Sequence, residues 1–183
     1  MKSDELMWQE VEEVDRRKEP LFDLITVKSR SADGTEANFI KVTPPDWVTV
    51  IPVLPDGRIL MVRQYRHGIA SLSEEFPAGV VDAGEDALQA AHRELEEETG
   101  YVAGEMIPIG KINPNPAFMT NTSYTYLARD LKKVSDQSLD EHERIEFFTL
   151  DEKEIEEKMG GETMASAIMV QAWYWYQSGK RAN

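Results

Sequence analysis

The chain has 183 residues, of which 41% are hydrophobic and 30% are charged, and its formal net charge is −14. This composition indicates a folded chain and argues against disorder, while the acidic excess argues against nucleic acid or an anionic membrane as the main partner. The chain contains no cysteine, which excludes disulfides and zinc–thiolate sites.

No targeting or membrane segment is evident. Residues 1–20 lack the apolar centre of a signal peptide, and no run of 18 apolar residues occurs. We therefore expect a protein that does not cross a membrane and, by default, is cytoplasmic. The composition gives no argument against the periplasm.

The first part of the chain predicts a small antiparallel β segment. Residues 1–20 are polar and are expected to be helical or frayed. Residues 21–27 and 37–42 have the composition of strands, and an Asp-Gly pair between them predicts a turn. The pair Pro44-Pro45 then interrupts the chain. We expect a boundary there, which gives an N-terminal β segment of residues 1–44 and a main domain of residues 45–183.

The main domain is expected to contain a mixed sheet flanked by helices. The Asp56-Gly57 pair predicts a second hairpin between the first two strands. Thr149 and Glu152 form a capping-box pattern for a helix that ends at Gly160-Gly161. A second helix is expected over residues 163–178, closed by Gly179, with its aromatic residues in the core or in a dimer interface. The strands are expected at residues 47–54, 59–64, 107–112, 123–128 and 144–149. This order predicts an α/β fold of the α/β/α sandwich type.

An acidic cluster lies on a third expected helix, within GVVDAGEDALQAAHRELEEETGY at residues 79–101. Glu94, Glu97 and Glu98 fall three and four residues apart and share one helix face. Such carboxylates repel one another unless a cation joins them, and as hard oxygen ligands they suit Mg²⁺, Mn²⁺ or Ca²⁺. The alternative is a solvated acidic face.

The residues around the cluster support a helix packed on a core. Gly79 allows a tight turn before the helix, and Gly100 is positioned as its C-terminal cap. An apolar stripe at i, i+3 and i+7 is expected to anchor the helix. It consists of Leu88, Ala91 and Leu95.

The spacing of this segment resembles the Nudix box, the signature of hydrolases that cut a nucleoside diphosphate linked to another group. The matching positions are Gly79, Glu85, Arg93-Glu94-Leu95, Glu97-Glu98 and Gly100. Tyr101 departs from the aliphatic residue usual there, at a position that packs rather than reacts. The resemblance covers about residues 45–180 and implies a Nudix α/β/α sandwich. Residues 1–44 look like the N-terminal sheet domain of ADP-ribose pyrophosphatases, which implies a homodimer that shares or exchanges this segment.

Features outside the box resemble the branch that cleaves nucleoside diphosphate sugars. In Val-Arg-Gln-Tyr-Arg, Arg66 is the expected phosphate-binding residue, with a surface arginine as the alternative. In Glu-Phe-Pro-Ala-Gly, Ala78 is expected to offer its carbonyl to a metal, and Glu75 is either a substrate contact or a structural acid. Pro116 resembles the branch's marker proline. Phe118 and Trp47 are candidates for stacking on a base or ribose, with buried packing favoured for each.

The resemblance also implies a metal-dependent mechanism. Glu94 and Glu98 would ligate Mg²⁺ most directly, with Mn²⁺ as a second candidate, and Glu97 would either ligate the metal or hold a metal-bound water. Arg93 would fix the rotamer of a carboxylate. The acidic loop DEHERIE would supply the general base, for which Glu143 is favoured and Glu141 comes second. The expected reaction is hydrolysis of ADP-ribose, GDP-mannose or a relative to a nucleoside monophosphate and a sugar phosphate. The alternatives are another Nudix substrate, such as a dinucleoside polyphosphate, and a non-catalytic ligand-binding regulator.

Overall fold

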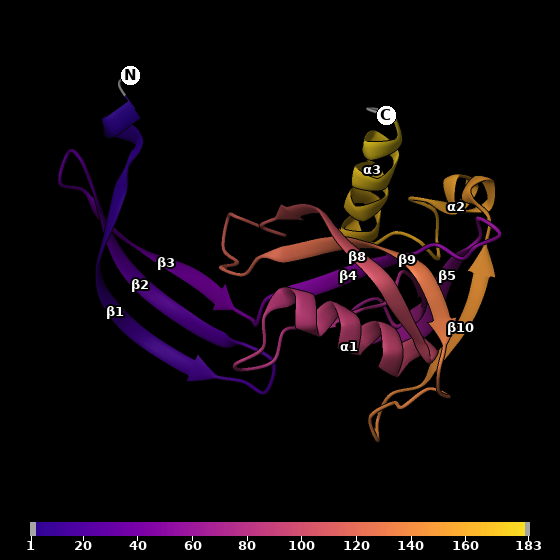
Figure 1. The fold of residues 1–183 in the computed structure, drawn as a ribbon. Coiled ribbons are helices and arrows are strands. Elements are labelled where there is room, and N and C mark those ends of the chain that lie inside the picture. The colour runs from indigo at the N-terminus through magenta and orange to yellow at the C-terminus, as the bar shows by residue number, and fades with distance from the viewer. Residues whose placement is uncertain (1–2, 182–183) are drawn as a thin grey trace. The chain divides into compact units, whose positions relative to one another are not determined.

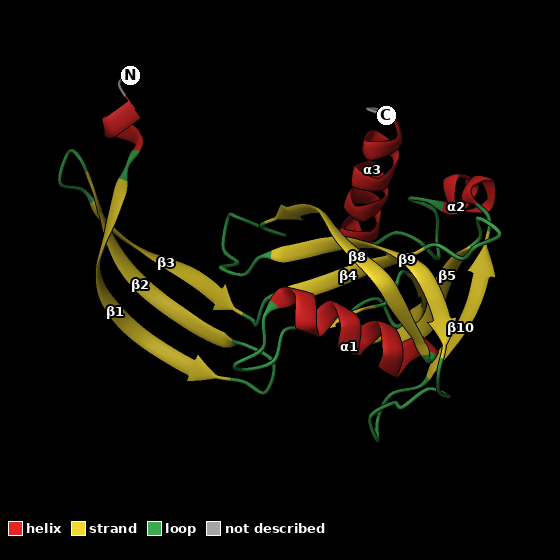
Figure 2. Cartoon of the chain, in the orientation of Figure 1, coloured by secondary structure: helices red, strands yellow, loops and turns green. Residues whose placement is uncertain are grey.

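The computed structural model describes residues 3–181, which divide into two compact units (Figures 1 and 2). One unit holds the chain up to Pro45 together with Asn113–Asn121. The other holds Asp46–Ile112 and the chain from Thr122 onward. The structure thus adds a distant loop, residues 113–121, to the N-terminal segment, a feature that no local sequence pattern indicates.

The first unit is built on a three-stranded antiparallel sheet in the order β1-β2-β3. The predicted hairpin is present as β2 and β3, with Gly34 in its turn at a φ of 89°. Its elements are the 3-10 helix η1 (Ser3–Leu6), β1 (Trp8–Lys18), β2 (Asp23–Ser31) and β3 (Glu36–Thr43).

The prediction of a helical or frayed segment at residues 1–20 is wrong where the structure describes it, because Trp8–Lys18 is a full strand. Residues 1–2 lie outside the described part. The strand is polar, yet its charges meet opposite charges across the sheet, as in the Lys28–Glu12 pair at 3.1 Å and the Lys41–Glu10 pair at 2.6 Å. Cross-strand pairs of this kind favour a sheet that lacks an alternating apolar pattern.

The second unit contains two sheets, one of order β7-β4-β9-β8 and one of order β10-β5-β6. The first sheet is mixed, as predicted, because β4 is parallel to β9 and antiparallel to β7. The strands are β4 (Trp47–Pro52), β5 (Ile59–Arg66), β6 (Ser71–Glu75), β7 (Ala78–Val80), β8 (Tyr101–Ile112), β9 (Ser123–Lys133) and β10 (Ile145–Leu150).

The prediction that β4 and β5 pair as a second hairpin is wrong. The chain does turn at Gly57, where φ is 87°, and Leu54 N–H donates to the Arg58 carbonyl at 2.8 Å. After an isolated bridge between Val53 and Ile59, however, the two strands enter different sheets. A turn sequence sets the reversal of the chain, whereas burial on distant partners decides which strands pair.

Helices cover both faces of the β-structure in this unit (Figure 1). Along β4, Val48 and Val50 pack in a core that includes Leu95 of α1, while Ile51 packs in a second core with Trp173 of α3. This two-residue alternation is what a sheet between two helical layers requires, and it confirms the α/β/α architecture. The helices are α1 (Ala87–Thr99), α2 (Glu152–Lys158) and α3 (Ala167–Arg181).

The ends of the last two helices differ from the prediction. The capping box of α2 is formed by Asp151 and Glu154, two residues beyond the expected pair. Helix α3 begins only at Ala167, because the carbonyl of Thr163 is held at the edge of β6 by the Glu74 amide at 2.7 Å. Trp173 and Tyr176 are buried, which confirms a core role for these two aromatics. No helix of the described residues is long and apolar enough to cross a membrane.

Candidate active site

Helix α1 is fixed at both ends by its own sequence. The Asp86 carboxylate accepts the amides of Leu88 and Gln89, both at 2.9 Å, and the Gln89 side chain accepts the Asp86 amide at 3.0 Å. At the other end, Gly100 caps the helix with a φ of 74°, as predicted. The predicted apolar stripe is correct at Ala91 and Leu95 but wrong at Leu88, which is exposed.

Two of the three predicted metal-binding carboxylates are buried on this helix. Glu98 is 3% exposed and Glu94 is 9% exposed, whereas Glu97 is more open, with 40% of its side chain exposed. The amide of Ala78 donates to Glu98 Oε2 at 3.0 Å, which joins β7 to the helix. The predicted ligands Ala78 and Glu98 therefore lie together.

The structure corrects the role of Gly79. Its backbone is not in the left-handed region, so a tight turn is not the reason for glycine there. Instead, a Cβ at this position would overlap the carboxylate of Glu94. Glycine is required because the carboxylate lies directly against the backbone of β7.

Arg93 holds several carboxylates at once, as the sequence predicts for at least one of them. Its guanidinium donates to Glu94 at 2.7 Å, to Glu97 at 3.0 Å and to Glu85 at 2.9 Å. It also donates to the Val80 carbonyl at 2.9 Å. These bonds, those to Glu85 first, raise the pKa of Arg93, so the arginine is a permanent cation among acids.

Burial gives the two inner carboxyl groups unusual proton affinities. Loss of solvent raises the pKa of Glu94, and it raises the pKa of Glu98 well above the ordinary value. The charge of Glu94 adds to the effect on Glu98. Two adjacent buried carboxylates favour either a proton or a cation between them.

The donor set fits a hard divalent cation, although the carboxylates are not prearranged around one point. Within residues 3–181, no three acidic or histidine groups already form a metal-binding cluster. Arg93 binds Glu94 and Glu97, and the Ala78 amide binds Glu98. Binding of a cation would therefore compete with Arg93 for these oxygens.

A cavity of about 500 Å³ adjoins Ala78 and Gly79 and contains the predicted substrate-binding pair. Arg66 forms a two-bond contact with Glu75, at 2.9 Å from Nε and 2.5 Å from Nη2. These bonds with Glu75 raise the pKa of Arg66. Arg66 therefore lines a defined cavity, and Glu75, only 4% exposed, orients it.

Trp47 of β4, a predicted stacking candidate, lies in the wall of this cavity and is half-buried. Other residues of the cavity carry no sequence signal. Among them is Thr49, whose buried hydroxyl has no hydrogen-bond partner among the described residues. Ser73 of β6 and Met169 of α3 also line it. These side chains meet only through tertiary folding, so a search for motifs could not have found them.

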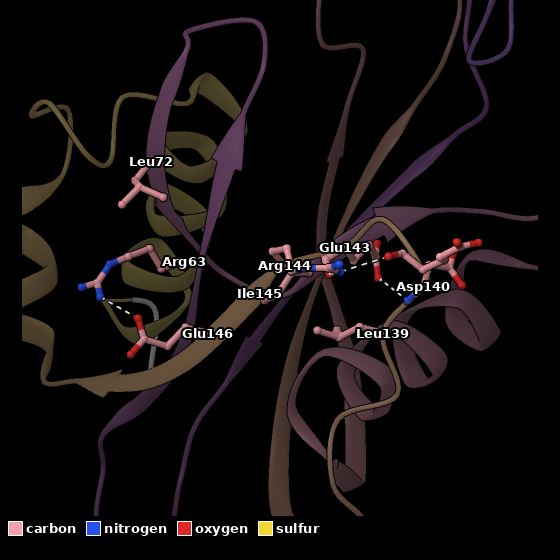
Figure 3. A pocket seen from close by; sticks show the side chains of 9 residues that line it. Arg63, Leu72, Leu139, Asp140, Glu143, Arg144, Ile145 and Glu146 are labelled. Carbon is pink, nitrogen blue, oxygen red and sulfur yellow. Dashed lines mark hydrogen bonds and ion pairs between the residues drawn. The ribbon is translucent and has the colours of Figure 1, made fainter.

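The acidic loop lines a second, open cavity of about 730 Å³ (Figure 3). The Glu143 carboxylate accepts the Asp140 amide at 3.1 Å, and the charge of Glu143 raises the pKa of both Glu94 and Glu98. Glu141 lines the same cavity and is exposed. Of the two predicted bases, Glu143 is thus the one whose charge acts on the carboxylates of α1.

Phe118 belongs to the first unit, where its carbonyl accepts the Val42 amide at 2.8 Å. Its side chain is 44% exposed, so the expectation that it would be buried by packing is wrong. An exposed aromatic ring on a loop is available for stacking.

Comparisons with known proteins show the family of this chain. The family described as NUDIX domain matches residues 43–168. The ADP-ribose pyrophosphatase of Bacillus subtilis (strain 168) is 37% identical over 106 residues, which cover 57% of each chain. The methanol dehydrogenase activator of Bacillus methanolicus is 39% identical over 114 residues, covering 61% of this chain and 62% of that protein. This chain therefore spans less than two thirds of the length of these curated relatives.

A solved structure, described as the crystal structure of ADP compounds hydrolase, superposes with a TM-score of 0.80. The match covers 97% of this chain and 93% of the other, at 22% identity. Similarity at this level of identity establishes the shared fold.

Proposed function

This chain belongs to the Nudix family, and we propose that it hydrolyses the diphosphate bond of nucleoside diphosphate sugars, ADP-ribose among them. The observation that carries the proposal is the meeting of two groups of residues. The buried carboxylates of Glu94 and Glu98 lie against β7, and Ala78 and Gly79 of the same strand line a cavity that Arg66 also lines. Such a site can hold a divalent cation and a diphosphate next to each other. The names of the relatives, which include ADP-ribose pyrophosphatase and ADP-sugar pyrophosphatase, support the same substrate class.

Glu94, Glu97, Glu98 and the carbonyl of Ala78 would hold the metal, for which Mg²⁺ is our first choice and Mn²⁺ the second. When bound, a divalent cation neutralises the charge of the diphosphate and favours ionisation of the attacking water. Arg93 would hold the carboxylates of Glu94 and Glu97 in orientation, because its Nη1 donates to both of them.

The remaining residues bind substrate and move the proton. Arg66 would bind the diphosphate through its planar guanidinium, held in place by Glu75. Glu143 would take the proton of the attacking water, and Glu141 is the second candidate for this role. The products would be a nucleoside monophosphate and a sugar phosphate.

The first unit is proposed to serve dimerisation and base recognition. Its sheet exposes Trp8, Val11, Phe39 and Ile40, an apolar set that a second copy of this chain would cover in a homodimer. Phe118 is the proposed stacking partner for a base or ribose.

Two alternatives use the same site differently. One is hydrolysis of another Nudix substrate, such as a dinucleoside polyphosphate. The other is a non-catalytic, ligand-binding regulator, for which the activator named among the relatives is a reason. The complete set of box carboxylates, Glu94, Glu97 and Glu98, favours catalysis over a purely regulatory role.

A substrate panel tests the proposal. ADP-ribose, GDP-mannose, UDP-glucose, a dinucleoside polyphosphate and a nucleoside triphosphate are incubated with the protein and Mg²⁺, and a phosphatase then releases phosphate from any monoester product. We expect metal-dependent release from ADP-ribose and other sugar nucleotides. Release from the dinucleoside polyphosphate alone would support the first alternative, and no release from any compound would support the second.

A further inference from the structure

The C-terminus of α1 is capped by the segment that leads into the acidic loop. The last four carbonyls of a helix have no partner within the helix and must be satisfied from outside. Here all four carbonyls are satisfied, two of them by the consecutive residues Gln137 and Ser138, which lead into the acidic loop. The donors are the Gly100 amide for Glu96 (2.7 Å), the Ser138 amide for Glu97 (2.9 Å), the Gln137 side chain for Glu98 (2.6 Å) and the Lys133 ammonium for Thr99 (3.5 Å).

The side-chain amide of Gln137 also closes the loop on itself. Its Nε2 donates to the Ile145 carbonyl at 3.2 Å in addition to the Glu98 carbonyl. Ile145 is the first residue of β10, so one amide group joins the helix that bears the carboxylates to both ends of residues 137–145. Gly100 permits this close approach, because a Cβ there would overlap the Ser135 carbonyl.

Glu143 lies within the closed segment. Its amide donates to the Asp140 carbonyl at 3.0 Å, and Arg144 braces the same stretch by donating to the Glu141 carbonyl at 3.0 Å. These local bonds shape the loop, but they do not attach it to α1 (Figure 3). Among the interactions described for the loop, attachment to α1 runs through Gln137 and Ser138.

We propose that Gln137 is a positioning residue, which holds the acidic loop so that Glu143 faces Glu94 and Glu98. This inference rests on the proposed function, in which Glu143 is the base. A neutral amide suits the role, because its two N–H groups reach two carbonyls at once. Leucine has a similar size but no donor, and it would leave both carbonyls to solvent.

A double-mutant cycle on turnover tests this role. We expect Gln137→Leu to lower kcat for ADP-ribose by roughly 10- to 100-fold, the scale of a misplaced catalytic group, with KM within about twofold. In a Glu143→Gln background, the same change should lower kcat by less than about twofold, because the group being positioned is already disabled. Lys133→Met, which removes a cap of the same helix from β9 rather than from the loop, is the matched control and should leave kcat unchanged.

Hydrogen exchange supplies a second measurement that does not depend on activity. The amides of Ser138 and Glu143 should lose protection in Gln137→Leu and keep it in Lys133→Met, while the amides of α1 stay protected in both. The proposal is overturned if Gln137→Leu leaves kcat unchanged, or if it lowers kcat equally in the wild type and in the Glu143→Gln variant. If the wild type cleaves no sugar nucleotide, the proposed function fails, and exchange alone then decides whether Gln137 holds the loop. Unchanged protection would show that it does not.

Discussion

Gly79 and Glu94 are in such close contact that residue 79 has no room for a side chain. A Cβ on residue 79 would overlap the Glu94 carboxylate, which also accepts a hydrogen bond from Arg93 at 2.7 Å. The glycine that opens the Nudix box and one of its metal-binding acids are therefore parts of one packing arrangement.

This contact predicts the effect of Gly79→Ala. The added methyl group should displace Glu94 and lower kcat by roughly 100-fold, while overpacking costs about 1–3 kcal/mol of stability. Steady-state kinetics and denaturant unfolding measure the two effects. Gly68→Ala is the matched control, since a Cβ at Gly68 meets no atom within 4 Å. Equal activity of the two variants would show that Glu94 does not need its observed position.

The buried carboxyl groups predict how stability depends on pH. Because the pKa values of Glu94 and Glu98 are raised above the ordinary 4.5, the folded protein retains protons that the unfolded chain releases. Their contribution is fully present below about pH 4.5 and is lost as pH rises through the raised values, by at most about 1.4 kcal/mol per pH unit for each group. Groups with lowered pKa, such as Glu74 and Glu85, change stability only below that range.

We therefore expect the metal-free protein to become less stable as pH rises from about 4.5 through the raised pKa values, and Mg²⁺ to restore stability increasingly as pH rises. Urea unfolding in EDTA and in Mg²⁺ measures this, and Glu98→Gln should flatten the metal-free curve. A metal-free stability that increases over this range would contradict the burial of charge at Glu98.

The two candidate bases can be separated by substitution. Glu143→Gln should lower turnover by roughly 10²- to 10⁴-fold, the usual range for a general base, while the Mg²⁺-induced rise in Tm persists. Glu141→Gln should leave turnover within about threefold, because the charge that acts on the carboxylates of α1 is that of Glu143. If only the Glu141 variant loses activity, the base is assigned to the wrong residue.

Local chemistry made much of this protein predictable. The C-terminal cap of α1 at Gly100, the burial of Ala91 and Leu95, and the clustering of acids depend on residues near one another in the chain, where spacing and geometry are directly related. The Nudix resemblance extended this to the fold, which the structural comparison confirms.

The features that were missed all depend on distant partners. The pairing of β4 with β9 rather than β5 follows from burial on two faces, and β1 forms because its charges meet those of β2 and β3. The Arg66–Glu75 contact joins residues 9 positions apart. The two hydrogen bonds donated by Gln137 join it to Glu98, 39 positions away, and to Ile145, 8 positions away. No periodicity in the sequence encodes such contacts.

In the proposed function, the buried carboxylates of α1 support metal-dependent cleavage of a sugar nucleotide. This role is tested by comparing Mg²⁺-dependent hydrolysis of ADP-ribose by the wild type, Glu98→Gln and Glu96→Gln, since Glu96 is an exposed acid on the same helix. We predict that Glu98→Gln loses most activity while retaining its fold, and that Glu96→Gln keeps activity within about twofold of the wild type. Near-normal turnover by Glu98→Gln in Mg²⁺ would contradict the assignment of the metal site.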